Sequence, residues 1–398
     1  MNLANCNYSK TMAHLNKLQV CALITTGRTG SDFLQSLLDN HTEILTFNGI
    51  FWFHNFWEKS KCVQYAGKDS TILNDLLDEF FGFFIEKFKS KYDYLERKDC
   101  LGIDGNKVID IDLKKFKTVV INLLKNEYIC SKSFMLAVYG GYAICLNQDL
   151  NKKKILVHHI HHVEKLPDYI EDFPNSIILC MTRDPRANFV SGIIHHREYS
   201  ETTDNERHLL YYIKRIITDA YSADKFSKNV MVLKIEDLGK KCILMSLCSW
   251  LGVRYEDAMT KSTWAGLMWH GDRISKKYNT EIGFSKKMLQ NNWNQKMTTK
   301  DKYIFNFIMN DRLINYEYEY KKIHIYDWLI VPMIMFLPLK FELSFFSINY
   351  FKKHIKNKDY KVLIMNNIQY ARRVIFFYLY YFRKISGFKF YRKYIKCD

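Results

Sequence analysis

The sequence predicts an α/β protein with a central parallel sheet, followed by a helical, basic and aromatic C-terminal appendage. Apolar runs of strand length alternate with helical stretches, such as 73–88 and 209–226, up to about residue 320. Two of the apolar runs lead directly into a turn that opens a helix, which is typical of parallel βα units. The composition then changes abruptly. We therefore predict two parts, residues 1–322 and residues 323–398.

The first predicted strand is the apolar run Val20–Ile24, and a glycine-marked loop follows it. The loop reads Thr26-Gly27-Arg28-Thr29-Gly30-Ser31. A strand, a tight turn and a helix start gather backbone N–H groups around an anion. Arg28 adds a charged fork, Thr29 and Ser31 add hydroxyl donors, and Asp32 opens the helix, where its charge suits the dipole. The loop lacks the spacing and the lysine of a Walker A motif.

The second motif follows the apolar run Ile177–Thr182, which is typical of a buried parallel strand. Arg183 comes directly after it, at the carboxyl end of the strand. Pro185 suits the first turn of a new helix and places Ser191 about two turns along it. Ligands of open α/β sheets bind at the carboxyl ends of strands. Arg183 and Ser191 are therefore candidates to hold a second phosphate of the same ligand.

With these two motifs in this order, the chain resembles the sulfotransferases that use 3′-phosphoadenosine 5′-phosphosulfate (PAPS). The loop 26–31 is similar to the family's 5′-phosphosulfate loop, with Arg28 where other members have lysine. Arg183 and Ser191 are similar to its 3′-phosphate pair. The resemblance implies PAPS as cosubstrate, released as the bisphosphate PAP, and no metal. We count the loop residues, Asp32, Arg183 and Ser191 as cosubstrate-binding candidates.

Two later segments extend the resemblance to about residues 18–300. Residues 231–238 are similar to the family's strand ending in Glu-Asp-Leu, and 251–253 to the turn after the next helix. The family implies a P-loop-like three-layer sandwich. It also implies in-line sulfuryl transfer to an acceptor hydroxyl or amine, with Arg28 and the loop N–H groups holding the charge on the leaving phosphate.

The acceptor needs a base that titrates near neutrality, and a histidine cluster ends another predicted strand. The cluster consists of His158, His159, His161 and His162. In an extended strand, His159 and His161 share one face. The family's catalytic histidine lies about twenty residues before the 3′-phosphate arginine, which points to His161. His159, His158, the carboxylate of Glu164 and a metal-binding role for the histidines stay open as alternatives.

A late block, residues 262–272, looks like the late segment of bacterial and Golgi-type carbohydrate sulfotransferases. In the family a late loop closes over the nucleotide, so Gly283, Phe284 and Ser285 are candidates for that role. Tryptophans in the block suit stacking on a sugar or filling of the core edge. Trp52, His54 and Trp57 fall under the same two alternatives.

The net charge and the cysteines of the sequence limit which partners and which cellular compartment are expected. The net charge is +17, yet no nucleic-acid-binding motif appears. Ten cysteines form no CxxC pair and no signal peptide is evident, so a reducing cytoplasm is expected. The apolar run 326–341 is short and broken by proline, and basic and aromatic residues follow it. These features favour a region that lies on an anionic membrane surface. Helices that pack on the preceding domain and expose their charges to water stay open as the alternative.

The sequence thus favours a PAPS-dependent sulfotransferase, peripheral or monotopic on the inner face of the membrane. The expected acceptor is a carbohydrate or a lipid-linked saccharide. Two other classes stay open: an NTP-dependent, kinase-like enzyme, and a non-catalytic glycan-binding or membrane-binding relative. Neither the acceptor nor the choice between O- and N-sulfation follows from the sequence, because acceptor pockets vary within a fold.

Overall fold

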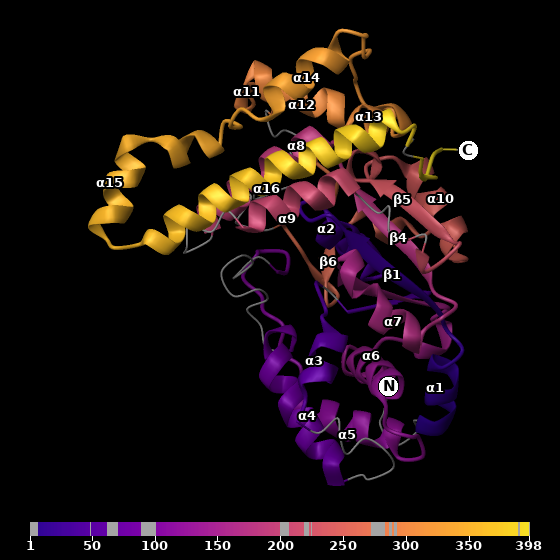
Figure 1. Cartoon of the computed structure of the whole chain (residues 1–398). Helices are drawn as coiled ribbons and strands as arrows, with labels where there is room; N and C mark the ends of the chain where they lie inside the picture. Colours follow the sequence, from indigo (N-terminus) through magenta and orange to yellow (C-terminus); the bar gives the residue numbers. More distant parts are fainter. Residues whose placement is uncertain are drawn as a thin grey trace.

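The structure is a computed structural model that describes residues 7–47, 49–61, 71–88, 101–199, 207–218, 223, 225–271, 283–285, 289, 293–388 and 391–397. Its centre is a five-stranded parallel sheet with strand order β2-β3-β1-β4-β5, flanked by helices (Figure 1). The strands are β1 (Gln19–Thr25), β2 (Ile44–Thr46), β3 (Ile155–His161), β4 (Ile177–Thr182) and β5 (Val230–Lys234). The predicted α/β sandwich with a central parallel sheet is confirmed.

Helices surround this sheet, and a small hairpin packs beside it. The first helices are α1 (Tyr8–Leu15), α2 (Ser31–Leu38), α3 (Phe53–Lys59), α4 (Thr71–Phe84), α5 (Leu113–Leu124), α6 (Ser131–Cys145) and α7 (Leu166–Asp172). Then follow α8 (Pro185–Tyr199), α9 (Arg207–Thr218), α10 (Lys241–Leu251), α11 (Trp293–Lys296), α12 (Thr299–Ile308) and α13 (Asn310–Asn315). The hairpin is β6 (Thr263–Trp264) with β7 (Leu267–Met268), and it packs against α2.

Strand connections leave a crevice between β1 and β4, which are neighbours in the sheet. From β1 the chain passes through α2 to β2 at one edge of the sheet. From β4 it passes through α8 and α9 to β5 at the other edge. Where the connections of adjacent parallel strands diverge, a crevice opens beyond their carboxyl ends, and ligands bind there. Both motifs of the sequence, the glycine loop and the Arg183 turn, begin at this crevice.

Local start and stop signals are confirmed. Pro185 is the first residue of α8, where its fixed φ fits and its missing N–H is not needed. Gly252 ends α10 in the left-handed conformation, with φ of 71°, and its N–H bonds to the last turn of the helix. The strand expected at Val20–Ile24 extends one residue further at each end. These signals are local, so the sequence alone shows them.

The C-terminal region consists of α14 (Asp327–Met335), α15 (Ile348–Lys356) and the long α16 (Tyr360–Ile385). It shares an apolar core with the preceding part of the chain. Phe189 of α8 lies 4.4 Å from Phe305 of α12, ring centre to ring centre, and Phe305 lies 6.3 Å from Phe377 of α16. Figure 1 shows these helices on one side of the molecule and α3 to α6 on the other. The boundary at residue 322 stays a prediction.

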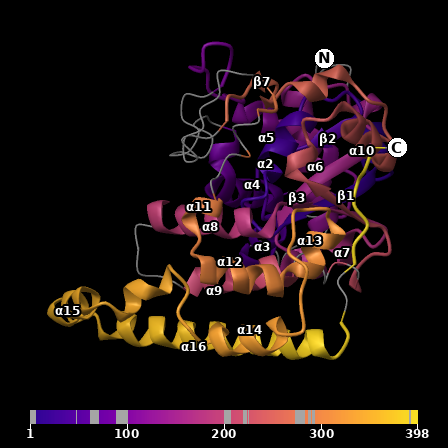
Figure 2. The same cartoon turned by 90° about the horizontal axis from the view of Figure 1, so that it is seen from above.

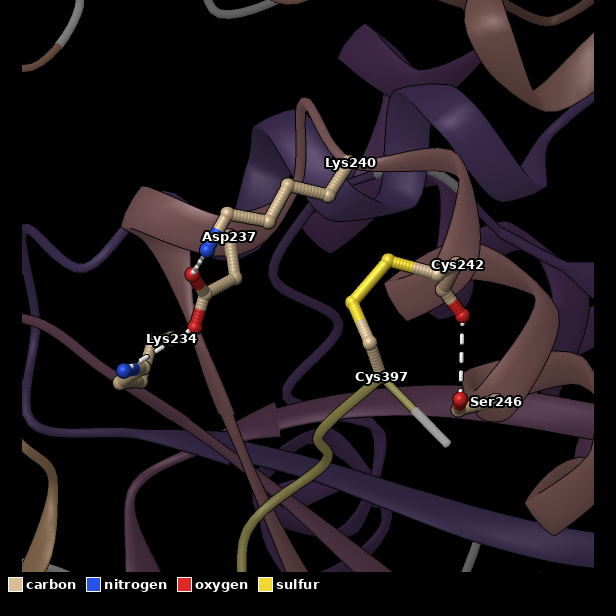
Figure 3. The surroundings of a disulfide bond; sticks show 6 residues. All are labelled: Lys234, Asp237, Lys240, Cys242, Ser246 and Cys397. Carbon is tan, nitrogen blue, oxygen red and sulfur yellow. Dashed lines mark hydrogen bonds and ion pairs between the residues drawn. A yellow bond between two sulfur atoms is a disulfide. The ribbon is translucent and has the colours of Figure 1, made fainter.

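Beyond α16 the chain returns to the sheet and covers its β5 edge. Val232 of β5 receives a parallel bridge from the terminal segment, with Val232 N–H donating to the Lys393 carbonyl at 3.0 Å and Ile395 N–H to the Val232 carbonyl at 2.9 Å. A disulfide between Cys242 of α10 and Cys397 fastens this segment (Figure 3). This contact occupies the middle of the β5 edge, where an uncovered strand could pair with another chain.

The cysteine pattern did not predict this pair, because its partners lie 155 residues apart. Disulfides persist in oxidising compartments and are rare in a reducing cytosol. The Cys242–Cys397 pair is therefore unusual for the reducing cytoplasm expected from the sequence. The cytoplasmic location stays a prediction.

Candidate active site

The loop between β1 and α2 is tightly folded because three of its residues have left-handed backbone angles. Gly27, Arg28 and Gly30 have φ of 89°, 54° and 82°. The Gly27 N–H donates to Thr25 Oγ1 at 2.9 Å, and the Thr25 hydroxyl contacts that of Thr29. Gly30 caps α2 without a side-chain hydrogen bond, so the first N–H groups of the helix face the loop without a side-chain cap. This geometry suits a bound anion.

Both loop glycines also lie against neighbouring side chains. A Cβ atom on Gly30 would lie 2.3 Å from Ile235 Cδ1, and one on Gly27 would lie 3.2 Å from Tyr212 Cε2. Ile235 begins the Glu-Asp-Leu segment after β5, and Tyr212 belongs to α9. The loop is thus held from two sides by elements far away in the sequence.

Arg183 follows β4 and is 7% exposed. The next residue, Asp184, is held from two directions. Its N–H donates to Glu236 Oε1 at 3.0 Å, and Tyr318 donates to the other oxygen of Glu236 at 2.9 Å. Its carboxylate accepts from Arg186 Nε at 3.0 Å and from Nη2 at 2.7 Å, so Asp184 orients this arginine. These contacts fix the turn that carries Arg183.

Positive charge from both motifs gathers at the crevice. Burial lowers the pKa of Arg183, the Arg28 charge lowers it further, and Glu236 acts in the opposite direction. Arg28 is half-buried, and its Nε is buried without a hydrogen-bond partner among the described residues. A guanidinium held out of water needs an acceptor, which a phosphate or sulfonate group supplies. The two predicted motifs are therefore brought together at a site that fits an anion with two charged ends.

The first turn of α8 is tied to the glycine loop. Asn188 Nδ2 donates to Thr26 Oγ1 at 2.8 Å. The Tyr212 hydroxyl lies 3.1 Å from the Gly27 carbonyl and 2.9 Å from that of Asn188. Ser191 is half-buried one turn after Asn188, on the same face of α8. Its pairing with Arg183 on one ligand stays a prediction.

The histidine strand does not stay regular to its end. Leu23 of β1 pairs with His159, but Ile24 pairs with His161, so Ile160 is an extra residue in β3. His161 has φ of 77°. The regular extended geometry assumed from the sequence therefore does not hold at His161, the last residue of β3. Such bulges re-aim side chains, and here the rings of His159 and His161 meet, 5.2 Å apart at their centres.

A chain of hydrogen bonds sets the protons on these two rings. The Gly49 N–H donates to Gln35 Oε1 at 3.0 Å, so this oxygen is an acceptor. It lies 2.8 Å from His159 Nδ1, which therefore carries a proton and leaves Nε2 with a lone pair. His161 Nδ1 lies 3.2 Å from His159 Nε2 and donates to it. The remaining nitrogen of His161, Nε2, then bears the lone pair that a general base requires.

His158 belongs to the core. It is fully buried, its Nδ1 lies 2.8 Å from the Tyr139 hydroxyl, and its ring stacks on Tyr169. His162 has its pKa lowered to about 4, first by burial and then by the Arg215 charge. Glu164 is bound by Arg215, with 3.2 Å between Oε1 and Nε. Of the candidate bases, His161 has the best-defined protonation and geometry.

The pKa of His161 lies well below its usual range. Burial is the main cause, the positive charges of Arg215 and Arg28 add to it, and His159 and His162 would add to it when protonated. The imidazole is thus neutral at pH 7. Asp32 Oδ1 lies 3.6 Å from His159 Nδ1, beside the chain of bonds, in addition to its place at the start of α2.

The late loop residues lie close to α2. The Phe284 ring centre is 6.1 Å from that of Phe33, which lies two residues after Ser31. Gly283 has φ of 96° and fits tightly against the Thr260 carbonyl, and Ser285 is buried. These positions place the segment beside the helix that starts at the glycine loop. Its role in covering a nucleotide stays a prediction.

The tryptophans of the late block are core residues. Trp264 and Trp269 are 1% and 3% exposed and contact each other, so neither offers a face to a sugar. Asp272 lies outside the described residues. Trp52, in contrast, is 49% exposed. The adjacent Phe51 N–H donates to the His159 carbonyl at 3.1 Å, which places Trp52 near the histidines.

Sequence reasoning missed three residues that organise the site: Gln35, Asn188 and Tyr212. Gln35 stands among the apolar residues of α2 and is fully buried. A polar amide at such a position needs buried hydrogen-bond partners, and this is the one signal that could have marked it. Among the described residues, no group of three His, Cys, Asp or Glu side chains is arranged to hold a metal ion.

Two of the solved structures that are similar to the chain are sulfotransferase domains. One comes from the Synechococcus PCC 7002 olefin synthase, with 11% identity, a TM-score of 0.40, and coverage of 69% of this chain and 86% of that one. The other comes from the curacin biosynthetic pathway, with 13% identity, a TM-score of 0.41, and coverage of 76% and 99%. No protein-family model and no curated protein matches the sequence. Similarity at this level carries no argument about function, which must come from the site.

Proposed function

We propose that the protein transfers a sulfuryl group from PAPS to an acceptor hydroxyl or amine. One arrangement supports the proposal: the Arg28 loop lies within electrostatic reach of both the Arg183 turn and the His161 ring, and the three segments end the neighbouring strands β1, β4 and β3. A ligand with an anionic group at each end fits two separate arginines. An acceptor fits beside a neutral histidine, His161, whose Nε2 carries no proton and can accept one.

In this reaction, the proton of the acceptor moves to a side chain of the protein. His161 Nε2 takes the proton of the acceptor, whose oxygen or nitrogen forms a bond to sulfur while the bond from sulfur to the bridging phosphate oxygen breaks. The proton stays on His161 until it passes to solvent. His159 and Gln35 act as positioning residues, because their bonds keep Nδ1 of His161 as a donor and Nε2 as the base. No proton transfer beyond His161 is needed.

The anion is held by charge and by fixed donors. Arg28 and the N–H groups at the start of α2 face the developing charge on the leaving phosphate, and they require no rearrangement during the step. Arg183 holds the second phosphate, with Ser191 as an additional donor. Binding of such an anion also neutralises the charges that lower the pKa of His161, so the base becomes stronger once the cosubstrate is bound.

We propose a saccharide as the acceptor, either free or lipid-linked. Exposed Trp52 supports this choice, because an indole face covers the apolar side of a sugar ring. Replacing Trp52 by Ala should raise the acceptor KM and leave the PAP affinity unchanged. An equal rise for all acceptor classes would argue against a sugar-stacking role.

The direct test is turnover with PAPS that carries labelled sulfur, offered with candidate glycans and lipid-linked saccharides. The proposal expects label in the acceptor and PAP in equal amount. Arg28→Ala should lower turnover, since it removes charge stabilisation at the leaving group. Binding of PAP without any turnover on a broad set of acceptors would favour a non-catalytic relative. Preferential transfer of phosphate from ATP would favour a kinase.

A further inference from the structure

Helix α16 buries several polar side chains and exposes several large apolar ones. Its buried face includes Asn366, Gln369 and Arg373, which are at most 4% exposed. Arg373 is held by the buried carboxylate of Glu342, with 2.6 Å between Nη2 and Oε2. A helix at a water-exposed surface shows the opposite arrangement. The outward face of α16 is therefore unlike a surface adapted to water.

Large apolar side chains form a stripe along this outward face. Their exposed fractions run from 38% to 64%. The stripe consists of Ile364, Ile368, Ile375, Leu379 and Phe382. These positions recur every three to seven residues, so they lie on one side of the helix. A contiguous exposed apolar surface of this kind marks an interaction site.

Helix α14 continues the apolar surface beside α16. Leu329, Met333 and Phe336 are 70%, 68% and 51% exposed. The two helices are joined by hydrogen bonds from Tyr378 to the Pro332 carbonyl at 2.5 Å and from Tyr381 to the Trp328 carbonyl at 2.6 Å. Figure 2 shows α14, α15 and α16 along one side of the molecule. We call the outward surface of these three helices the outer layer.

Basic residues border the apolar stripe. Lys361, Arg372 and Arg383 are exposed at intervals of 11 residues, about three helical turns, so they form a row along one flank of α16. Lysines of α15 add to this charge. They are Lys352, Lys353 and Lys356, all exposed. Residues 323–398 contain fourteen Lys and Arg against four Asp and Glu, a net charge of +10 out of +17 for the whole chain.

We propose that the outer layer binds an anionic lipid bilayer, with the apolar stripe in the headgroup boundary and the basic row at the lipid phosphates. Apolar and aromatic side chains bordered by Lys and Arg are the composition of interfacial helices. In the described part of the chain, no helix is long and apolar enough to cross a bilayer. The proposal does not depend on the proposed chemistry.

Charge distinguishes a bilayer from a second copy of the chain as the occupant. Of the acidic residues described in the region, Asp327 and Glu342 are buried, and Asp359 faces His354 at 3.6 Å. A second copy would therefore bring basic row against basic row with few carboxylates to balance it. Anionic lipid supplies the missing charge.

The test is co-sedimentation of the full-length protein with vesicles of phosphatidylcholine, with and without phosphatidylglycerol. The wild type should sediment with the anionic vesicles and lose this binding as salt rises. The charge variant Lys361→Gln/Arg372→Gln/Arg383→Gln should bind the anionic vesicles roughly a hundredfold more weakly, about fivefold for each residue. Wild-type protein that stays in the supernatant with anionic vesicles overturns the proposal.

A second variant tests the apolar stripe. Ile364→Glu/Ile375→Glu/Leu379→Glu should abolish binding to the anionic vesicles. The matched control places the same substitution at exposed apolar residues outside the layer, Ile103→Glu and Met245→Glu, which are 75% and 50% exposed, and it should bind like the wild type. Thermal unfolding checks that each variant folds. If the stripe variant misfolds, the charge variant and the salt dependence still decide.

Sedimentation velocity without lipid tests the rival occupant. If the proposal is right, the stripe substitutions should leave the oligomeric state of the protein in solution unchanged. A wild-type dimer that becomes monomeric in the stripe variant, combined with no binding of wild type to vesicles, would identify the outer layer as a subunit interface.

Discussion

His161 Nδ1 lies 3.2 Å from His159 Nε2, and this contact determines which nitrogen of His161 can act as a base. Gln35 fixes the proton on His159 Nδ1, so Nε2 of His159 accepts and Nδ1 of His161 donates. The lone pair of His161 is thereby directed to its Nε2. Two neighbouring rings and one buried amide thus set the protonation of the site.

Replacement of the base is the first prediction. His161→Gln should lower kcat by about 10²–10⁴, because a positioned general base contributes about that factor. Affinity for PAP should stay unchanged, since His161 does not hold the phosphates. His162→Gln is the matched control, one residue further along, and should keep most of the activity. An equal loss in both variants would show that the base has been assigned wrongly.

The pH dependence follows from the direction of the pKa shift. Only the neutral form of His161 accepts a proton, and its pKa lies well below the ordinary 6.5, chiefly because of burial. Activity should therefore be flat above pH 6.5 and fall only as pH drops through the lowered pKa. Bound cosubstrate neutralises nearby charge and raises this pKa. The acid limb of kcat should thus lie at higher pH than that of kcat/KM, which reports the free enzyme.

Profiles of kcat and kcat/KM against pH check this order. Coinciding limbs would mean that the anion does not sit near His161. An acid limb of kcat/KM that lies above pH 7 would contradict the lowered pKa of His161 in the free enzyme.

Local signals were predictable from the sequence. The run Val20–Ile24, the helix start at Pro185 and the helix end at Gly252 each depend on a few adjacent residues and their backbone preferences. The residue types of the glycine loop and of Arg183 also indicated an anion site. Such features need no knowledge of which distant segments meet.

The rest depends on contacts between distant segments. Gln35 and His159 are 124 residues apart, and nothing in either segment marks the other as its partner. The bulge at Ile160 reflects pairing with β1 rather than the sequence of β3 alone. Composition indicated an interfacial C-terminal region, but the inward position of Arg373 became visible only through its buried partner Glu342.

Gly30 should be the most sensitive glycine of the loop. Gly30→Ala requires φ of 82° for a residue with a Cβ and brings that atom 2.3 Å from Ile235 Cδ1. The left-handed backbone should lower the free energy of unfolding by about 1–2 kcal/mol, and the close contact with Ile235 should lower it by about 1–3 kcal/mol more. PAP affinity should fall as well, because the loop shifts.

Gly252→Ala serves as the control for backbone strain. Its φ is 71°, and among the described residues no atom outside its chain neighbours lies within 4 Å of the added Cβ. Urea unfolding should show the smaller, backbone-only loss, with PAP affinity intact. Equal losses at both positions would contradict the close packing of the loop against Ile235.

The disulfide predicts a specific cross-linked peptide. Peptide mapping without reductant should find the peptide of Cys242 joined to that of Cys397, and reduction should separate them. Cys397→Ser should lower the unfolding free energy by about 2–5 kcal/mol, since the bond closes a long loop. Cys145→Ser, at a free half-buried cysteine, is the control and should lack this effect. Unlinked peptides from non-reduced protein would contradict the pair.

Calorimetric titration of the full-length protein with PAP and with ATP tests the central claim most directly. We predict that PAP binds more tightly than ATP, and that Arg28→Ala and Arg183→Ala each weaken PAP binding, because each removes one of two charge-assisted contacts worth about 1.5–3 kcal/mol. Tighter binding of ATP, or PAP binding that is unchanged in Arg183→Ala, would show that the two motifs do not share one ligand.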